Sequence, residues 1–206
     1  MEELDLLKRD WKKKENSFQQ ISELDIYKMV HKQSSSIVKL ILILSVLEVL
    51  LWSVISIFYN SDDYLIKMDS DYLIKYLQIL NLVNYAVIAI FIYLFYKNYI
   101  SISITTSTKK LMKAILKTRN TVQIYVWYNL VMIAIGMIIG MALAFKTNPE
   151  IEHMLDNDKV FYIAIAFCIV ALIIVFGLFW LFYRLVYGML LRKLLTNYKE
   201  LKKIDL

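Results

Sequence analysis

The stretch SIVKLILILSVLEVLLWSVISIFYN, which covers residues 36–60, decides the fold of this chain. Between residues 37 and 58 it carries only two charged side chains, Lys39 and Glu48. A helix rises ~1.5 Å per residue, so about 20 apolar residues cross the ~30 Å hydrocarbon core of a bilayer. The stretch therefore predicts a membrane-spanning helix.

Glu48 is the notable residue of this predicted span. Counted from Ile37, it lies about 16 Å into the helix, near the bilayer midplane. An ionisable group at that depth costs ~2.5 kcal/mol or more and normally faces protein or water. We therefore expect Glu48 to face other helices, with Asn84, Tyr85 or Asn129 as its partners.

The rest of the chain has the same apolar character. Hydrophobic residues make up 59% of the 206 residues, and the mean hydropathy is +0.54. Long apolar runs predict four spans, at about 37–58, 73–97, 121–145 and 160–187. Only four Gly and one Pro interrupt the chain, which favours helices. The predicted fold class is all-α: a polytopic membrane protein with a four-transmembrane-helix bundle.

Several helices are expected to extend beyond the membrane. Ser22 and Asp25 read as a helix N-cap and the acidic member of a capping box, so one helix is expected over about 23–59. A basic amphipathic helix at about 107–120 is expected to continue directly into the third span. The fourth helix is expected to reach about residue 200. Together these segments predict helical extensions on the cytoplasmic side.

The chain is expected to hold one membrane domain, residues 23–200, followed by a tail at 201–206. Before the domain, residues 1–22 predict a cytoplasmic amphipathic helix and a polar joint. Such a helix binds either anionic headgroups or a groove on a partner protein, and both interpretations are open. Its expected contact residues are Leu4, Leu7, Trp11, Lys12 and Lys13.

The distribution of Lys and Arg predicts the orientation. The segments up to Lys39, from Lys97 to Arg119 and from Arg184 onward carry 8, 6 and 6 of these residues, against 4 in the two remaining loops. Basic residues concentrate in cytoplasmic loops. Both termini are therefore expected in the cytoplasm, with the basic face toward anionic lipid headgroups or an acidic partner.

Polar residues mark one face of the second predicted span. Gln78, Asn81 and Tyr85 share that face, and Asn84 and Tyr85 come closest to the predicted depth of Glu48. Amides inside a membrane most often join helices, and the alternative is a polar permeation path. The expected intramembrane polar cluster is Glu48, Asn81, Asn84, Tyr85 and Asn129.

Small residues mark faces of the third and fourth spans. Gly136 and Gly140 form a GxxxG pattern, which lets two helix backbones approach closely. We expect this face to pack against the fourth span, with self-association of two chains as the alternative. In the fourth span, Trp180, Tyr183 and Tyr187 are expected to form an interfacial aromatic belt. The expected packing residues are Gly136, Gly140, Ala144, Ala164 and Cys168.

The sequence disfavours several functional classes. The two histidines, His31 and His153, are expected to be surface residues, and no cofactor or metal is predicted. No Ser/His, Cys/His or HExxH arrangement indicates an enzyme. The basic residues lie in short runs beside the spans, so nucleic-acid binding is not expected.

Three segments carry a resemblance to known sequences: DLLKRDWKKKENSF (5–18), ISELDIYKMVHKQSSSIVK (21–39) and STKKLMKAILKTRNTVQIYVWYN (107–129), about a third of the chain. They resemble a group of uncharacterised bacterial inner-membrane proteins with four predicted spans. Similar sequences are sometimes labelled carotene-cleaving oxygenases. That activity needs an iron site built from several histidines, and this chain has two. The resemblance implies a multi-pass protein of the bacterial inner membrane.

The expected function follows from these exclusions. A non-enzymatic integral membrane protein that serves as accessory subunit, scaffold or tether for a partner protein fits best. The partner would lie in or below the membrane. The alternative is a small transporter or channel that uses Glu48 and the polar face of the second span.

Overall fold

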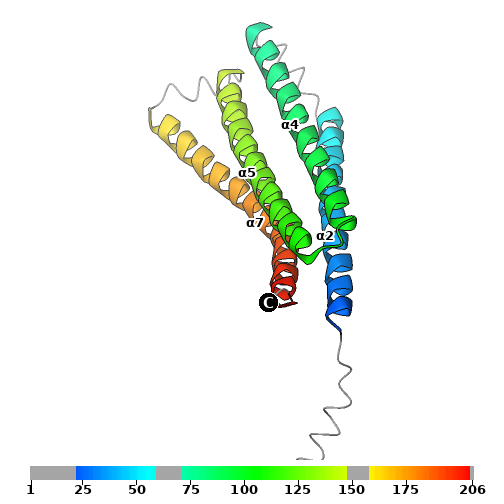
Figure 1. Ribbon diagram of the computed structural model, residues 1–206. Coiled ribbons are helices and arrows are strands. Elements are labelled where there is room, and N and C mark those ends of the chain that lie inside the picture. Colours follow the sequence, from blue (N-terminus) through cyan, green and yellow to red (C-terminus); the bar gives the residue numbers. More distant parts are fainter. Residues whose placement is uncertain (1–21, 59–70, 148–157, 205–206) are drawn as a thin grey trace, which may run out of the picture.

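The computed structural model describes residues 22–58, 71–147 and 158–204 (Figure 1). This part of the chain is all-helical and contains no strand. The N-terminal helix predicted at residues 1–22, with Leu4, Leu7, Trp11, Lys12 and Lys13, lies outside the described residues. The four helices are α2 (Glu23–Phe58), α4 (Asp71–Ser103), α5 (Thr108–Thr147) and α7 (Asp158–Ile204).

Helix α2 begins at the predicted cap. The backbone N–H of Asp25 donates to Ser22 Oγ at 3.2 Å, and the Ser22 hydroxyl donates to the Asp25 carboxylate at 2.7 Å. No Gly or Pro follows before Phe58, so nothing interrupts the backbone hydrogen bonds and the helix runs for 36 residues. The prediction of one continuous helix from about 23 to 59 is confirmed.

The other helices also continue past their apolar runs. Helix α5 joins the basic segment at 107–120 to the third predicted span, as expected, and α7 extends over 47 residues to Ile204. Helix α4 reaches Ser103, six residues beyond the predicted end of the second span. The added turns are held by packing, because Ile102 is completely buried.

The helices form a ring in the order α2, α4, α5, α7. The most extensive contacts join α5 to α7 and α2 to α4, and contacts of α2 with α7 and of α4 with α5 close the ring. Figure 1 shows that the helices lie close together near the C-terminus and fan apart toward the opposite end, where α7 diverges from α5. The packing is therefore concentrated at one end of the molecule.

The buried core confirms this concentration. Val38 and Ile41 of α2, Leu111 and Ile115 of α5 and Leu194 of α7 are fully buried. At the opposite end, large apolar side chains of α7 are open, with Ile163 69% and Phe167 75% exposed. We call the tightly packed end the basal bundle, which comprises residues 23–47, 95–103, 108–125 and 183–204.

All four helices are long and apolar enough to cross a membrane by length and composition. The candidate spans are Glu23–Ser56, Lys75–Ser103, Thr108–Phe145 and Val160–Lys203. Each combines an apolar part with a segment of the basal bundle. Water would disfavour the open apolar ends, whereas lipid chains would cover them without cost.

The predicted packing of the small faces is wrong for this arrangement. A Cβ atom built on Gly136 or on Gly140 would meet nothing within 4 Å. Ala144 is exposed as well, whereas Ala164 and Cys168 of α7 are half-buried. The physical reason is the divergence of α7 from α5 away from the C-terminus (Figure 1), which separates the parts of the two helices that carry these residues. The alternative, self-association through the glycine face, stays a prediction.

Candidate functional site

Three tyrosines surround the carboxyl group of Glu48. Tyr125 of α5 donates its hydroxyl to Glu48 Oε2 at 2.8 Å, and Tyr187 of α7 donates to the same oxygen at 3.2 Å. Tyr183 of α7 donates to Glu48 Oε1. A carboxyl group has enough lone pairs to accept all three O–H donors. The cluster, which we call the Glu48–tyrosine cluster, joins α2 to both α5 and α7.

The tyrosines are positioned by helical spacing and by aromatic packing. Tyr183 and Tyr187 lie one turn apart on the same face of α7, with ring centroids 5.9 Å apart. The Tyr125 ring packs edge-on against Tyr187 at 5.9 Å and against Phe95 of α4 at 5.3 Å. All three tyrosines are at most 2% exposed. The rings therefore hold the hydroxyl groups in place around Glu48.

The amides expected to pair with Glu48 bond elsewhere, which corrects that prediction. Asn84 accepts a hydrogen bond from the Tyr128 hydroxyl at 2.9 Å. Asn129 donates to the backbone carbonyl of Tyr125 at 2.9 Å, one turn earlier in its own helix. Tyr85 is exposed and makes no hydrogen bond with Glu48. The rotation and register of α5 and α7 bring the three tyrosine hydroxyl groups to the carboxyl group.

The predicted polar residues nevertheless line one cavity. A cavity of about 310 Å³ lies between the four helices, with Tyr125 and Tyr183 also in its wall. All five predicted members of the polar cluster line this cavity: Glu48, Asn81, Asn84, Tyr85 and Asn129.

The register of the helices also corrects the expected position of Glu48. Its carboxyl group contacts the turn of α7 that contains Arg184, the first charged residue after the long apolar run of that helix. Its partner Tyr125 packs on Phe95, two residues before Lys97 of α4. Glu48 thus lies near the ends of the neighbouring apolar runs, not opposite their middle.

The cause lies in the first part of the apolar run of α2. Ile37, Val38, Ile41 and Ser45 are buried in the basal bundle. The predicted depth of Glu48, counted from Ile37, assumes that these residues face lipid. Their apolar character serves packing against amphipathic segments of other helices instead.

A second set of polar contacts lies within the basal bundle. The buried Asn197 of α7 donates to the buried Ser34 of α2 at 2.9 Å. Tyr27 donates to the carbonyl of Thr105 at 2.9 Å. These contacts fix α2 against α7 and against the chain after α4.

His31 belongs to the same set, and its position corrects the expectation that it is a surface histidine. A nitrogen of its ring lies 2.8 Å from the carbonyl oxygen of Ile102, and the ring stacks on Tyr27 at 5.8 Å. It is therefore a half-buried joining residue instead of a surface histidine. His153 lies outside the described residues.

The tyrosines of the Glu48–tyrosine cluster were missed as functional residues by sequence reasoning. Tyr183 and Tyr187 were expected in an interfacial belt, and Tyr125 was not singled out. The available signals were the i, i+4 spacing of Tyr183 and Tyr187 at the end of one apolar run and the lone carboxylate of Glu48 within another.

The comparisons with known proteins give one result. The model of a family described as a domain of unknown function, DUF8845, matches residues 24–206. The chain belongs to this family. No curated protein and no solved structure matches the chain. The matched DUF8845 region starts at the beginning of α2 and contains the Glu48–tyrosine cluster and the basal bundle.

The basal bundle of this DUF8845 protein has a strongly basic surface. Its acidic side chains are Glu23, Asp25 and Glu200. No ion pair joins an acidic to a basic side chain in the described ranges, and among the same residues no group of three potential ligands could hold a metal ion. The exposed basic residues are Lys28, Lys32, Lys39, Lys97, Lys109, Lys110, Lys113, Lys117, Arg184, Arg192, Lys193, Lys199, Lys202 and Lys203.

Proposed function

We propose that this chain is a multi-pass protein of the bacterial inner membrane that acts as a non-enzymatic adaptor. Its apolar helix segments cross the bilayer, both termini lie in the cytoplasm, and the basal bundle holds a partner protein with an acidic surface. The partner makes the chain an accessory subunit, scaffold or tether.

The topology is supported by charge and shape together. Of the 24 Lys and Arg residues, 20 lie in the three segments assigned to the cytoplasm. The start of α2 and the end of α7 lie at the same end of the molecule (Figure 1). Basic residues at one end and open apolar faces at the other match the positive-inside pattern.

The observation that carries the adaptor function is the basal bundle itself. Membrane insertion alone needs only short basic loops, but this end has a buried core and specific contacts such as Asn197–Ser34. Its exposed cations have no acidic partner in the described part of the chain. A rigid surface of one charge sign steers and selects partners of the opposite sign.

The adaptor function is tested by crosslinking in intact cells. A photo-reactive residue at Lys113 should crosslink a defined protein, and one at Lys75, at the far end of α4, should not. Replacing Lys109, Lys110 and Lys117 by Glu should abolish the crosslink from position 113, and binding of the purified partner should weaken as salt rises.

Two results guard this test against error. Labelling of a cysteine at position 199 checks that charge reversal has not changed the orientation. A crosslink of equal strength at Lys75, or one that survives the three Glu substitutions, would contradict a basic docking surface.

A second candidate function is a small transporter or channel. The cavity of about 310 Å³ that contains Glu48 and three amides favours it. Polar groups within a helix bundle can line a path for ions or protons. Under this alternative Glu48→Gln abolishes transport in proteoliposomes, whereas under the adaptor function Glu48→Gln leaves partner crosslinking intact.

A further inference from the structure

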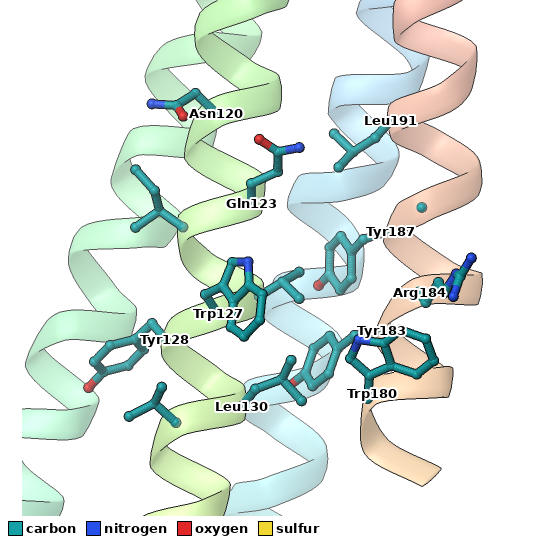
Figure 2. Close-up of a pocket in the computed structure, with 14 residues that line it drawn as sticks. Asn120, Gln123, Trp127, Tyr128, Leu130, Trp180, Tyr183, Arg184, Tyr187 and Leu191 are labelled. Atoms are coloured by element: carbon teal, nitrogen blue, oxygen red, sulfur yellow. The ribbon is translucent and has the colours of Figure 1, made fainter. Parts of the chain in front are cut away.

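A second, larger groove runs along the α5–α7 pair. It has a volume of about 740 Å³ and is lined by residues of those two helices alone, which are shown in Figure 2. Trp127 of α5 faces α7 in this view, and Trp180 and Arg184 lie on α7. Of the Glu48–tyrosine cluster, only Tyr183 and Tyr187 line this groove.

The chemistry of the groove changes along its length. On α5, Val131 and Trp127 come from the apolar run, and Gln123 and Asn120 follow toward the basal bundle. From Val131 to Asn120 the helix advances ~16 Å at its usual rise. A glycerophospholipid passes from acyl chains through glycerol to phosphate in the same direction. Tryptophan favours the zone where chains and headgroups meet.

The α7 side of the groove supplies a positive charge. Arg184 is exposed, and its guanidinium carbon lies 4.8 Å from the centre of the Trp180 ring. No acidic side chain forms an ion pair with it in the described residues. It stands where the apolar run of α7 ends. Arg binds phosphate through charge-assisted, often bidentate hydrogen bonds.

The amides and a glycine complete the recess. Asn120 and Gln123 are exposed and make no side-chain hydrogen bond within the described part of the chain, so their donors and acceptors are available. Gly188 lies one turn after Arg184, and a Cβ atom built there would meet only Arg184 Cγ, at 3.9 Å. The missing side chain leaves room beside the arginine.

We propose that the α5–α7 groove is a specific binding site for one anionic glycerophospholipid of the cytoplasmic leaflet. Arg184 pairs with the phosphate from the α7 rim. Asn120 and Gln123 bond headgroup oxygens from the α5 rim, and Trp127 and Trp180 flank the glycerol and the first part of the chains. The site relies on the membrane topology proposed above, and it does not depend on the adaptor function.

The test uses the full-length chain, purified in mild detergent, freed of lipid and titrated with phosphatidylglycerol under native mass spectrometry. Wild type should take up one tightly bound lipid. Arg184→Gln should bind it about tenfold more weakly, the usual effect of losing one charged hydrogen bond. Arg192→Gln is the matched control, because it removes an exposed arginine of α7 outside the groove and should bind like wild type.

A second variant separates the shape of the groove from its charge. Gly188→Leu keeps every charge but fills the recess, so it should also lose the tightly bound lipid. Unchanged thermal midpoints in detergent show that both variants are folded. If Gly188→Leu fails to fold, fluorescence quenching replaces this variant. Trp11 and Trp52 are changed to Phe, and bromine-labelled phosphatidylglycerol is then titrated to quench the fluorescence of Trp127 and Trp180. Saturable quenching should disappear in Arg184→Gln.

Three outcomes would overturn the proposal. Equal weakening by Arg184→Gln and Arg192→Gln would show a diffuse basic surface. Unchanged binding in all variants would show lipid bound elsewhere. A photo-reactive residue at position 127 that captures a polypeptide instead of lipid would make the groove a protein interface. Failure of the adaptor function is read separately, from the crosslink at Lys113, and failure of the topology from cysteine labelling.

Discussion

Glu48 offers its two oxygen atoms to three buried tyrosine hydroxyl groups, so its substitution affects three helices at once. Glu48→Leu leaves Tyr125, Tyr183 and Tyr187 without an acceptor, at about 1–3 kcal/mol for each buried donor that stays unpaired. Glu48→Gln retains a carbonyl oxygen and should cost much less. Thermal unfolding in detergent, followed by circular dichroism, measures both.

The exposed Glu200→Leu is the matched control for this series, and it should leave the midpoint nearly unchanged. A midpoint for Glu48→Leu equal to that of wild type would show that the Glu48–tyrosine cluster does not stabilise the bundle.

The contact between Asn197 and Ser34 makes a second prediction for single residues. Both side chains are buried, so Asn197→Ala leaves the Ser34 hydroxyl unpaired and should cost about 1–3 kcal/mol. Thr196→Ala is the neighbouring control, because Thr196 is exposed and bonds only to its own helix. A double-mutant cycle with Ser34→Ala measures the coupling, and zero coupling would argue against this contact.

At the scale of elements, the divergence of α7 from α5 should make the glycine face of α5 tolerant of larger side chains. Because a Cβ atom at Gly136 or Gly140 meets nothing within 4 Å, changing both to Leu should leave the fold intact. Size-exclusion chromatography and the thermal midpoint measure this. A midpoint lowered by several degrees, with loss of a dimer peak, would favour self-association through this face.

At the scale of the whole molecule, the orientation can be tested directly. With Cys168 replaced by Ser, single cysteines at positions 62 and 152 should react with an impermeant reagent in intact cells, and those at 14 and 199 should not. The reason is the inward bias of Lys and Arg. The reverse pattern would overturn the orientation and move the basal bundle out of the cytoplasm.

Removal of the N-terminal segment tests whether this segment contributes to binding of the partner protein. Removing residues 1–20 should leave insertion and the four-helix bundle intact, since α2 begins with its own cap at Ser22. If the segment contributes to docking, the crosslink at Lys113 should weaken in the truncated chain. An unchanged crosslink would assign the segment to lipid binding alone.

The sequence by itself determined the helices and their charge. Runs of about 20 apolar residues, the cap at Ser22 and the absence of Gly and Pro from Glu23 to Phe58 are local features, and they predicted long continuous helices. The bias of basic residues is likewise a property of the linear chain. Each of these signals acts within one helix and needs no knowledge of its neighbours.

Only the tertiary structure decided what surrounds Glu48 and where it lies. Its partners Tyr183 and Tyr187 are more than a hundred residues away along the chain, and they reach it because packing of the basal bundle sets the rotation and register of α7 against α2. The same packing buries Val38 and Ile41, which shifts Glu48 toward the ends of the neighbouring apolar runs. Periodicity fixes which residues share a face of one helix, but the depth and rotation of a helix depend on side-chain packing across all four.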